Sequence, residues 1–363
     1  MSVQPLIAQN QFVRKSLLSV RQPTPIWFER VRHKLGLPFW AGAVVIVLLP
    51  FVVLDFLSSY LVGSLEYYYT QEITQYASVV PFLILEYYGA AYCFSRIEHL
   101  QSYCKSLGVA QEVELDMGSL ASVKRIAILA AALSSVFIPI YVIFGTQKLS
   151  LAQNAVSLTV PWAFFFFVLA TFVYVYSYSM YLIYRMGNLP LRLKSFTEDR
   201  TLGLRPFGAI SLRLTLVYLG VVVLALVSTT QQPSGAGLAG PGAFYLALGF
   251  TGLASASLIL FILPLAGLHR KLVEAKRAEL SWLRPRRSNI VEMMRASADR
   301  GFEVDLLTEY NRVGQVERDV QQVHNWPLDI SILARLLAVI LSVTAIILSR
   351  VIANAFHFGK AGS

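Results

Sequence analysis

The chain has 363 residues, of which 56% are apolar or aromatic and only 14% are charged. A soluble domain carries about 25% charged residues, so this composition excludes an ordinary soluble protein, a disordered chain and a collagen. It indicates an all-α polytopic membrane protein. The net charge of +10 does not indicate nucleic-acid binding, because multi-pass proteins carry many Lys and Arg residues on their cytoplasmic loops.

A basic segment precedes the first long apolar run. Residues 1–37 hold six Lys or Arg residues, namely Arg14, Lys15, Arg21, Arg30, Arg32 and Lys34. A cleavable signal peptide would begin its apolar stretch much sooner. We therefore expect residues 1–37 to form a cytoplasmic segment and the first span to stay in the protein as an anchor.

Seven segments are long and apolar enough to be spanning helices, which need about 20 such residues each. In chain order they are 38–61, 77–96, 126–145, 157–184, 208–228, 242–268 and 330–353. The predicted organisation is the basic segment, six spans within 38–268, a cytoplasmic helical segment at 269–328, and the seventh span with an external tail at 329–363.

The connections between these spans alternate in charge. Assigned to alternate sides of the membrane, 27 basic residues fall on one side and one, Lys148, on the other. The positive-inside rule then predicts that the N-terminus is inside and the C-terminus is outside. We expect a multi-pass protein of the cell membrane with short external loops.

The cytoplasmic bulk lies between the sixth and seventh spans. We expect the sixth helix to continue past the membrane until Pro285 stops or kinks it. A second helix is expected from Ser288 to Gly301, and a third near 303–324. Eleven basic and nine acidic residues nearly balance in 269–328. The segment is either a set of solvated helices packed beneath the membrane or a coupling and assembly domain.

Catalytic and metal-binding motifs are missing from the sequence. There is no HExxH, GxSxG, Walker A or strand-associated GxGxxG pattern. The five histidines are scattered, the two cysteines have no zinc spacing, and the acids Glu112, Glu114 and Asp116 lack a calcium-binding loop. We expect no enzyme activity, no cofactor and no metal.

Two acidic residues fall inside predicted spans. A charge at membrane depth costs about 2.5–3.5 kcal/mol on insertion scales, so Asp55 and Glu86 are candidate functional residues. Asp55 is expected in the outer third of the first span and Glu86 near the middle of the second. They form either a ligand or cation site at an outer pocket, or acids that are protonated or hydrogen-bonded to nearby tyrosines.

Tyrosines supply the remaining candidate ligand-binding residues. Tyr88 belongs to a group near the first two spans, and Tyr174, Tyr178 and Tyr181 share a helical face by their i, i+4, i+7 spacing. Their rings offer an apolar wall with a polar hydroxyl. A ligand pocket is one interpretation, and interfacial anchoring with interhelical packing explains them equally well.

The last span carries a stripe of small residues. We call it the small-residue stripe, and its members recur every three or four positions: Ala338, Ser342, Ala345, Ser349 and Ala353. Arg335, Ser342 and Ser349 are also spaced by sevens, and the candidate pore-lining residues are Arg335, Ala338, Ser342, Ala345 and Ser349. Small residues allow two membrane helices to approach closely, and they also suit the wall of an axial pore. Both interpretations remain open on the sequence.

Two stretches, FILPLAGLHRKLVEAK at 261–276 and VHNWPLDISILARLLAVIL at 323–341, resemble a family of uncharacterised prokaryotic multi-pass proteins. The stretch DRTLGLRPFG at 199–208 fits the same group. The overall topology is similar to that of insect odorant and gustatory receptors, and that resemblance implies a tetrameric ligand-gated cation channel with a pore-lining last helix. Their Thr-Tyr motif is absent, since Thr344 precedes Ala345.

The favoured function is a homo-oligomeric, chemoreceptor-like channel whose last helix lines the pore. The alternatives are a proton- or cation-coupled transporter that uses the intramembrane acids, and a non-conducting sensor or scaffold. The expected partners are the lipid bilayer, further copies of the chain, with a tetramer favoured, and a small-molecule ligand.

Overall fold

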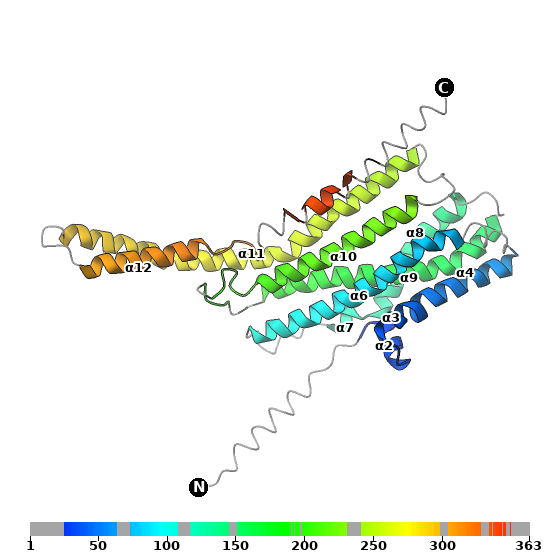
Figure 1. Ribbon diagram of the computed structural model, residues 1–363, viewed down its shortest axis with the longest axis horizontal. Helices are drawn as coiled ribbons and strands as arrows, with labels where there is room; N and C mark the ends of the chain where they lie inside the picture. Colours follow the sequence, from blue (N-terminus) through cyan, green and yellow to red (C-terminus); the bar gives the residue numbers. More distant parts are fainter. Residues whose placement is uncertain are drawn as a thin grey trace, which may run out of the picture.

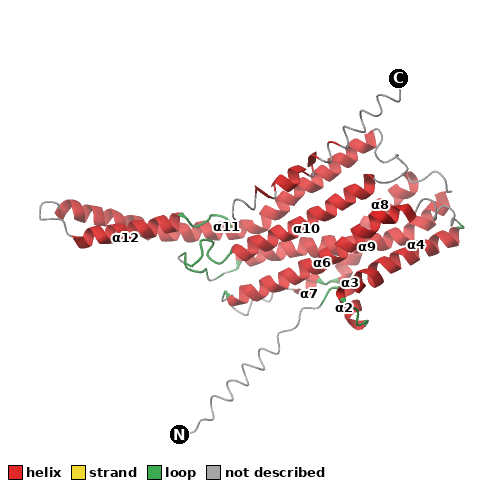
Figure 2. Cartoon of the chain, viewed as in Figure 1, coloured by secondary structure: helices red, strands yellow, loops and turns green. Residues whose placement is uncertain are grey.

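A computed structural model describes residues 25–63, 73–107, 117–144, 151–230 without 190, 192 and 197, 241–297, 304–327 and eleven positions within 334–349. Every regular element among these residues is a helix, as Figure 2 shows. The all-α prediction is therefore confirmed for the described part of the chain.

The helices follow the predicted order. They are α2 (Trp27–Lys34), α3 (Phe39–Gly42), the π-helix η1 (Ala43–Leu48), α4 (Leu49–Val62), α6 (Ile73–Ser106), α7 (Met117–Leu120), α8 (Val123–Phe144), α9 (Leu151–Asn188), α10 (Arg205–Thr230), α11 (Pro241–Ser297) and α12 (Val304–Gln321). Helical positions also occur within 334–349.

Five stretches are long and apolar enough to cross a membrane: Phe39–Val62, Gly118–Pro139, Thr159–Asn188, Arg205–Ala225 and Thr251–Ala296. They overlap five of the seven predicted spans, and their length and composition indicate a membrane protein. The predicted second span lies in α6, whose described middle carries Glu86, three tyrosines and Arg96 and is less apolar. The seventh, 330–353, is described only in part. Seven spans and the orientation of the termini stay predictions.

The first span changes helix type around a proline. Pro50 has no N–H to donate, and its ring crowds the carbonyl group of Ile46, four residues earlier. The wider π-turns of η1 lie directly before this point and accommodate the proline within a continuous span. The span ends at Gly63, whose φ of +74° is a left-handed conformation that suits glycine.

Side-chain contacts fix the relative directions of the helices. Phe51 of α4 contacts Tyr76 and Phe39 contacts Tyr88, so the first span and α6 are antiparallel. In the same way, α8 is antiparallel to α9 and α10 to α11. The helices α6 and α9 run in the same direction, since Phe82 stacks on Phe165 and Gly89 meets Phe172. This alternation is the one expected of successive spans (Figure 1).

A long hairpin leaves the bundle. In Figure 1, α11 extends well beyond the other helices, and α12 packs back along its projecting part. The prediction that 303–324 forms a helix is confirmed by α12. Of the two effects predicted for Pro285, a stop or a kink, the stop is wrong, because α11 passes through this proline to Ser297. The separate helix expected from Ser288 is wrong as well, since Ser288 lies inside α11. Packing of Leu283 and Ile290 against α12 compensates for the lost hydrogen bond.

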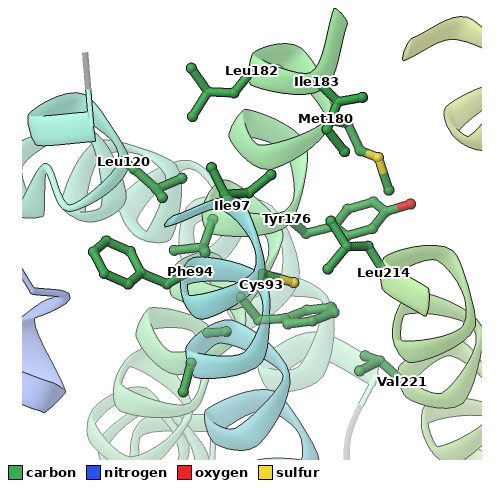
Figure 3. Close-up of a cluster of buried hydrophobic side chains, with 14 of the residues drawn as sticks. Cys93, Phe94, Ile97, Leu120, Tyr176, Met180, Leu182, Ile183, Leu214 and Val221 are labelled. Atoms are coloured by element: carbon green, nitrogen blue, oxygen red, sulfur yellow. The ribbon is translucent and has the colours of Figure 1, made fainter. Parts of the chain in front are cut away.

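The main core lies between α6, α9, α10 and α11. Gly89 lets α6 approach its neighbours closely, since a Cβ at this position would lie 2.8 Å from Phe172 and 3.0 Å from Val217. Figure 3 shows the neighbouring part of the core, with side chains from α6, α7, α9 and α10: Cys93, Phe94, Ile97, Leu120, Tyr176, Met180, Leu182, Ile183, Leu214 and Val221.

Candidate functional site

Asp55 lies buried on α4 and has a partner. The hydroxyl of Tyr76, on α6, donates a hydrogen bond to its Oδ2 atom. A hydrogen bond offsets part of the free-energy cost of burying a carboxyl group. Asp55 was expected either to bind a ligand or cation or to be hydrogen-bonded to a tyrosine, and the geometry supports the hydrogen bond.

Glu86 is fully buried, and neither of its carboxylate oxygens has a hydrogen-bond partner. It shares a face of α6 with Phe82, Ala90 and Cys93, which are all buried in the main core. An unpaired charge in such surroundings is very costly. This makes Glu86 the least satisfied acidic group among the described residues.

The two acids do not form one site. Tyr76, which holds Asp55, precedes Glu86 by ten positions on the same helix, about 15 Å along its axis at 1.5 Å per residue. Glu86 lies near the level at which the first span begins, because Tyr88, two positions further along α6, contacts Phe39.

Tyr88 packs away from Glu86. Its ring lies 5.0 Å from that of Phe39 and 5.5 Å from that of Tyr87, both with edge-to-face geometry. Tyr88 is therefore part of an aromatic contact between α6 and α3. The described structure does not bring it to either acid.

The three tyrosines of α9 form a ladder. Tyr174 stacks on Tyr178 at 5.9 Å, and Tyr178 contacts Tyr181 at 5.6 Å. The hydroxyl of Tyr174 donates to the carbonyl group of Ser119 at 2.6 Å and accepts from Arg125 at 3.4 Å. The predicted common face is confirmed, and its first member, Tyr174, lies at the start of α8.

The small-residue stripe points away from its own chain. Arg335, Ala338, Ser342, Ala345 and Ser349 are all exposed. On the opposite face Ile340 is buried and Thr344 is half-buried, although Leu337 is exposed. Ala353 lies outside the described residues. The hydroxyl of Ser342 donates to the carbonyl group of Ala338 at 2.7 Å. The stripe therefore does not pack within one subunit, as far as the described positions extend.

A contact that the sequence did not predict joins α11 to the residues that follow α12. The ring of His269, on α11, stacks on Trp326 with 4.3 Å between centroids, and its Nδ1–H donates to the carbonyl group of Asn325 at 2.7 Å. Lys276 caps the end of α12 by donating to the carbonyl groups of Gln321 and Val323. These bonds hold residues 321–326, which we call the linker to the last helix, against α11. No local pattern in the sequence indicated them.

The loop before α10 is organised by Asp199. Its carboxylate accepts hydrogen bonds from the backbone and hydroxyl of Thr201 and from the backbone N–H of Gly203. Partial burial alone would raise the pKa of Asp199, but these bonds and the charge of Arg205 outweigh it and lower the pKa. The loop also touches the linker, since the N–H of His324 donates to the carbonyl group of Arg200 at 3.1 Å.

The remaining candidate groups are a cysteine thiol and possible metal ligands. Burial raises the pKa of the Cys104 thiol to about 12, so it stays protonated and poorly nucleophilic at neutral pH. No cluster of three His, Cys, Asp or Glu side chains that could hold a metal occurs among the described residues.

Comparison of the chain with protein-family models, with curated proteins and with solved structures finds no match.

Proposed function

We propose that this chain is a subunit of a homo-oligomeric membrane channel in which the last helix faces the pore. One observation carries the proposal: the described residues of the small-residue stripe are exposed, whereas Ile340, on the opposite face of the same helix, is buried against its own bundle. Small and hydroxyl-bearing side chains around a symmetry axis leave room for water and ions. A closed ring of subunits, with a tetramer favoured, would place the stripe on that axis.

The fixed linker supports the same arrangement. His269 and Lys276 attach residues 321–326, the segment that precedes the last helix, to α11. A pore helix needs such an attachment, because a change in the cytoplasmic hairpin must reach it through connected rigid elements. Gating by a ligand would act through this connection.

The test measures ion flux and subunit number. Ser342→Trp should block ion flux in proteoliposomes by filling the axis, whereas Leu337→Trp, an exposed position outside the stripe, should leave the flux unchanged. Native mass spectrometry in mild detergent should give a closed ring of four or five subunits. A stable monomer, or unchanged flux with Ser342→Trp, would contradict the pore assignment.

The fully buried, unpartnered carboxyl group of Glu86 favours a second candidate, a proton-coupled transporter. With an imposed pH gradient, Glu86→Gln should abolish proton flux into proteoliposomes. Asp55→Asn is the matched control and should keep the flux, because Asp55 already has Tyr76 as a partner. Equal flux in both variants would exclude Glu86 as the coupling group. Wild-type protein that conducts nothing would favour the scaffold alternative.

A further inference from the structure

The short helix α2 is fixed against the bundle just before the first span. Ile26 and Phe28 are buried, and the indole N–H of Trp27 donates to the hydroxyl of Thr171 at 3.0 Å. The ring of Phe28 lies 4.6 Å from that of Tyr87. One face of α2 is therefore part of the core, and the opposite face has a defined position.

The position of α2 places it where the chain enters the membrane. A guanidinium N–H of Arg30 donates to the carbonyl group of Ala121, at 3.1 Å, which joins α2 to the start of α8. Gly36, with a φ of +63°, then turns the chain into the span that begins at Phe39. Figure 1 shows α2 at the side of the bundle, next to α3 and α7. The outer face of α2 thus lies at the ends of two candidate spans.

This outer face is cationic. We define the α2–α8 basic patch by its five exposed side chains: Arg30, His33, Lys34, Lys124 and Arg125. Among the described residues, the acidic groups on the neighbouring surface are Glu29, which is half-buried and faces Arg32 and His33, and Glu98. Positive charge exceeds negative charge among these described side chains.

Large apolar side chains border the patch and are exposed as well: Val31, Leu35, Trp40 and Val123. A free anion such as phosphate gains nothing from them. An anionic phospholipid matches both features, because its headgroup meets the cations while its acyl chains cover the apolar side chains.

We propose that the α2–α8 basic patch is a binding site for the headgroup of an anionic phospholipid in the leaflet that faces the N-terminus. Anionic lipids attract basic segments beside spans at the cytoplasmic surface, and the predicted N-in orientation places the patch there. The proposal is independent of whether the protein conducts ions.

The experiment uses the full chain in mild detergent with phosphatidylglycerol or phosphatidylcholine and counts retained lipids by native mass spectrometry. The wild type should retain phosphatidylglycerol preferentially. Lys34→Glu combined with Lys124→Glu should lower that retention by about tenfold or more. The matched control combines Lys105→Glu and Arg277→Glu, two exposed basic residues outside the patch, and should bind as the wild type does.

Three results would overturn the proposal. The first is equal retention of both lipids by the wild type. The second is an equal loss of phosphatidylglycerol in the control variant, which would indicate a non-specific effect of net charge. The third is displacement of phosphatidylglycerol by inorganic phosphate at millimolar concentration, which would assign the patch to free anions. Thermal unfolding of each variant without added lipid confirms that the compared proteins are folded.

Discussion

The bundle and the α11–α12 hairpin are stabilised in different ways. The bundle is held by close packing of large aromatic and aliphatic side chains around α6 and α9. The hairpin has four buried apolar residues, Leu283, Ile290, Val313 and Val320. The three ion pairs that join described residues all lie on α11 and α12.

The difference follows from the surroundings that each region is expected to have. Lipid is as apolar as a leucine side chain, so helices inside a membrane associate through shape and close approach. A two-helix hairpin in water has too little core to be specified by apolar burial alone, and directional charged hydrogen bonds then fix its register. Arg287 does so by donating to both Glu317, at 2.7 Å, and Tyr310, at 2.9 Å.

The largest effect is expected at the closest approach in the bundle. Gly89→Leu would force a side chain against the buried ring of Phe172 and should destabilise the protein by about 3 kcal/mol. Gly252→Leu is the matched control, because nothing lies within 4 Å of a Cβ at that helical glycine. Thermal unfolding in detergent should show a lowered melting temperature for Gly89→Leu alone. Equal melting temperatures would show that close packing does not govern the bundle.

A smaller effect is expected in the hairpin. Arg287→Leu would leave the carboxylate of Glu317, which is 7% exposed, without its cation. Arg286→Leu removes the exposed pair with Glu309 and should cost about 0–1 kcal/mol. Limited proteolysis should therefore cut the α11–α12 region several times faster in Arg287→Leu than in Arg286→Leu. The opposite order would contradict the role given to Arg287.

The smallest effect is expected where the two regions meet. Asp199→Asn should destabilise the loop before α10 by about 1 kcal/mol, since the carboxylate is partly exposed. Because the pKa of Asp199 is lowered by folding, its contribution is present above an unfolded pKa of about 3.9 and is lost as the pH falls through the folded value.

Unfolding followed from pH 7 to pH 3 checks this prediction. The wild type should lose stability at the acidic end, and Asp199→Asn should lack that part of the loss. Glu198→Gln, at the exposed neighbouring position, is the control and should follow the wild type. If the wild type and Asp199→Asn lose the same amount of stability at acidic pH, Asp199 does not stabilise the loop.

The sequence by itself determined the helices. Runs of apolar residues are a local property, and helices in a membrane must satisfy their backbone hydrogen bonds internally, so length and composition identify them. The i, i+4, i+7 spacing of Tyr174, Tyr178 and Tyr181 likewise determined their common face. The helix does not stop at Pro285, because packing of α11 on α12 outweighs the local tendency of proline to end a helix.

Only the tertiary structure decided which groups have partners. Asp55 and Glu86 look alike in the sequence, yet one is bonded to Tyr76 and the other has no partner. That distinction depends on residues from other helices and on their relative depth, which hydropathy does not encode. The same holds for the stacking of His269 on Trp326 and for the outward face of the small-residue stripe. Contacts between distant segments arise from the packing of whole helices, and no local pattern specifies them.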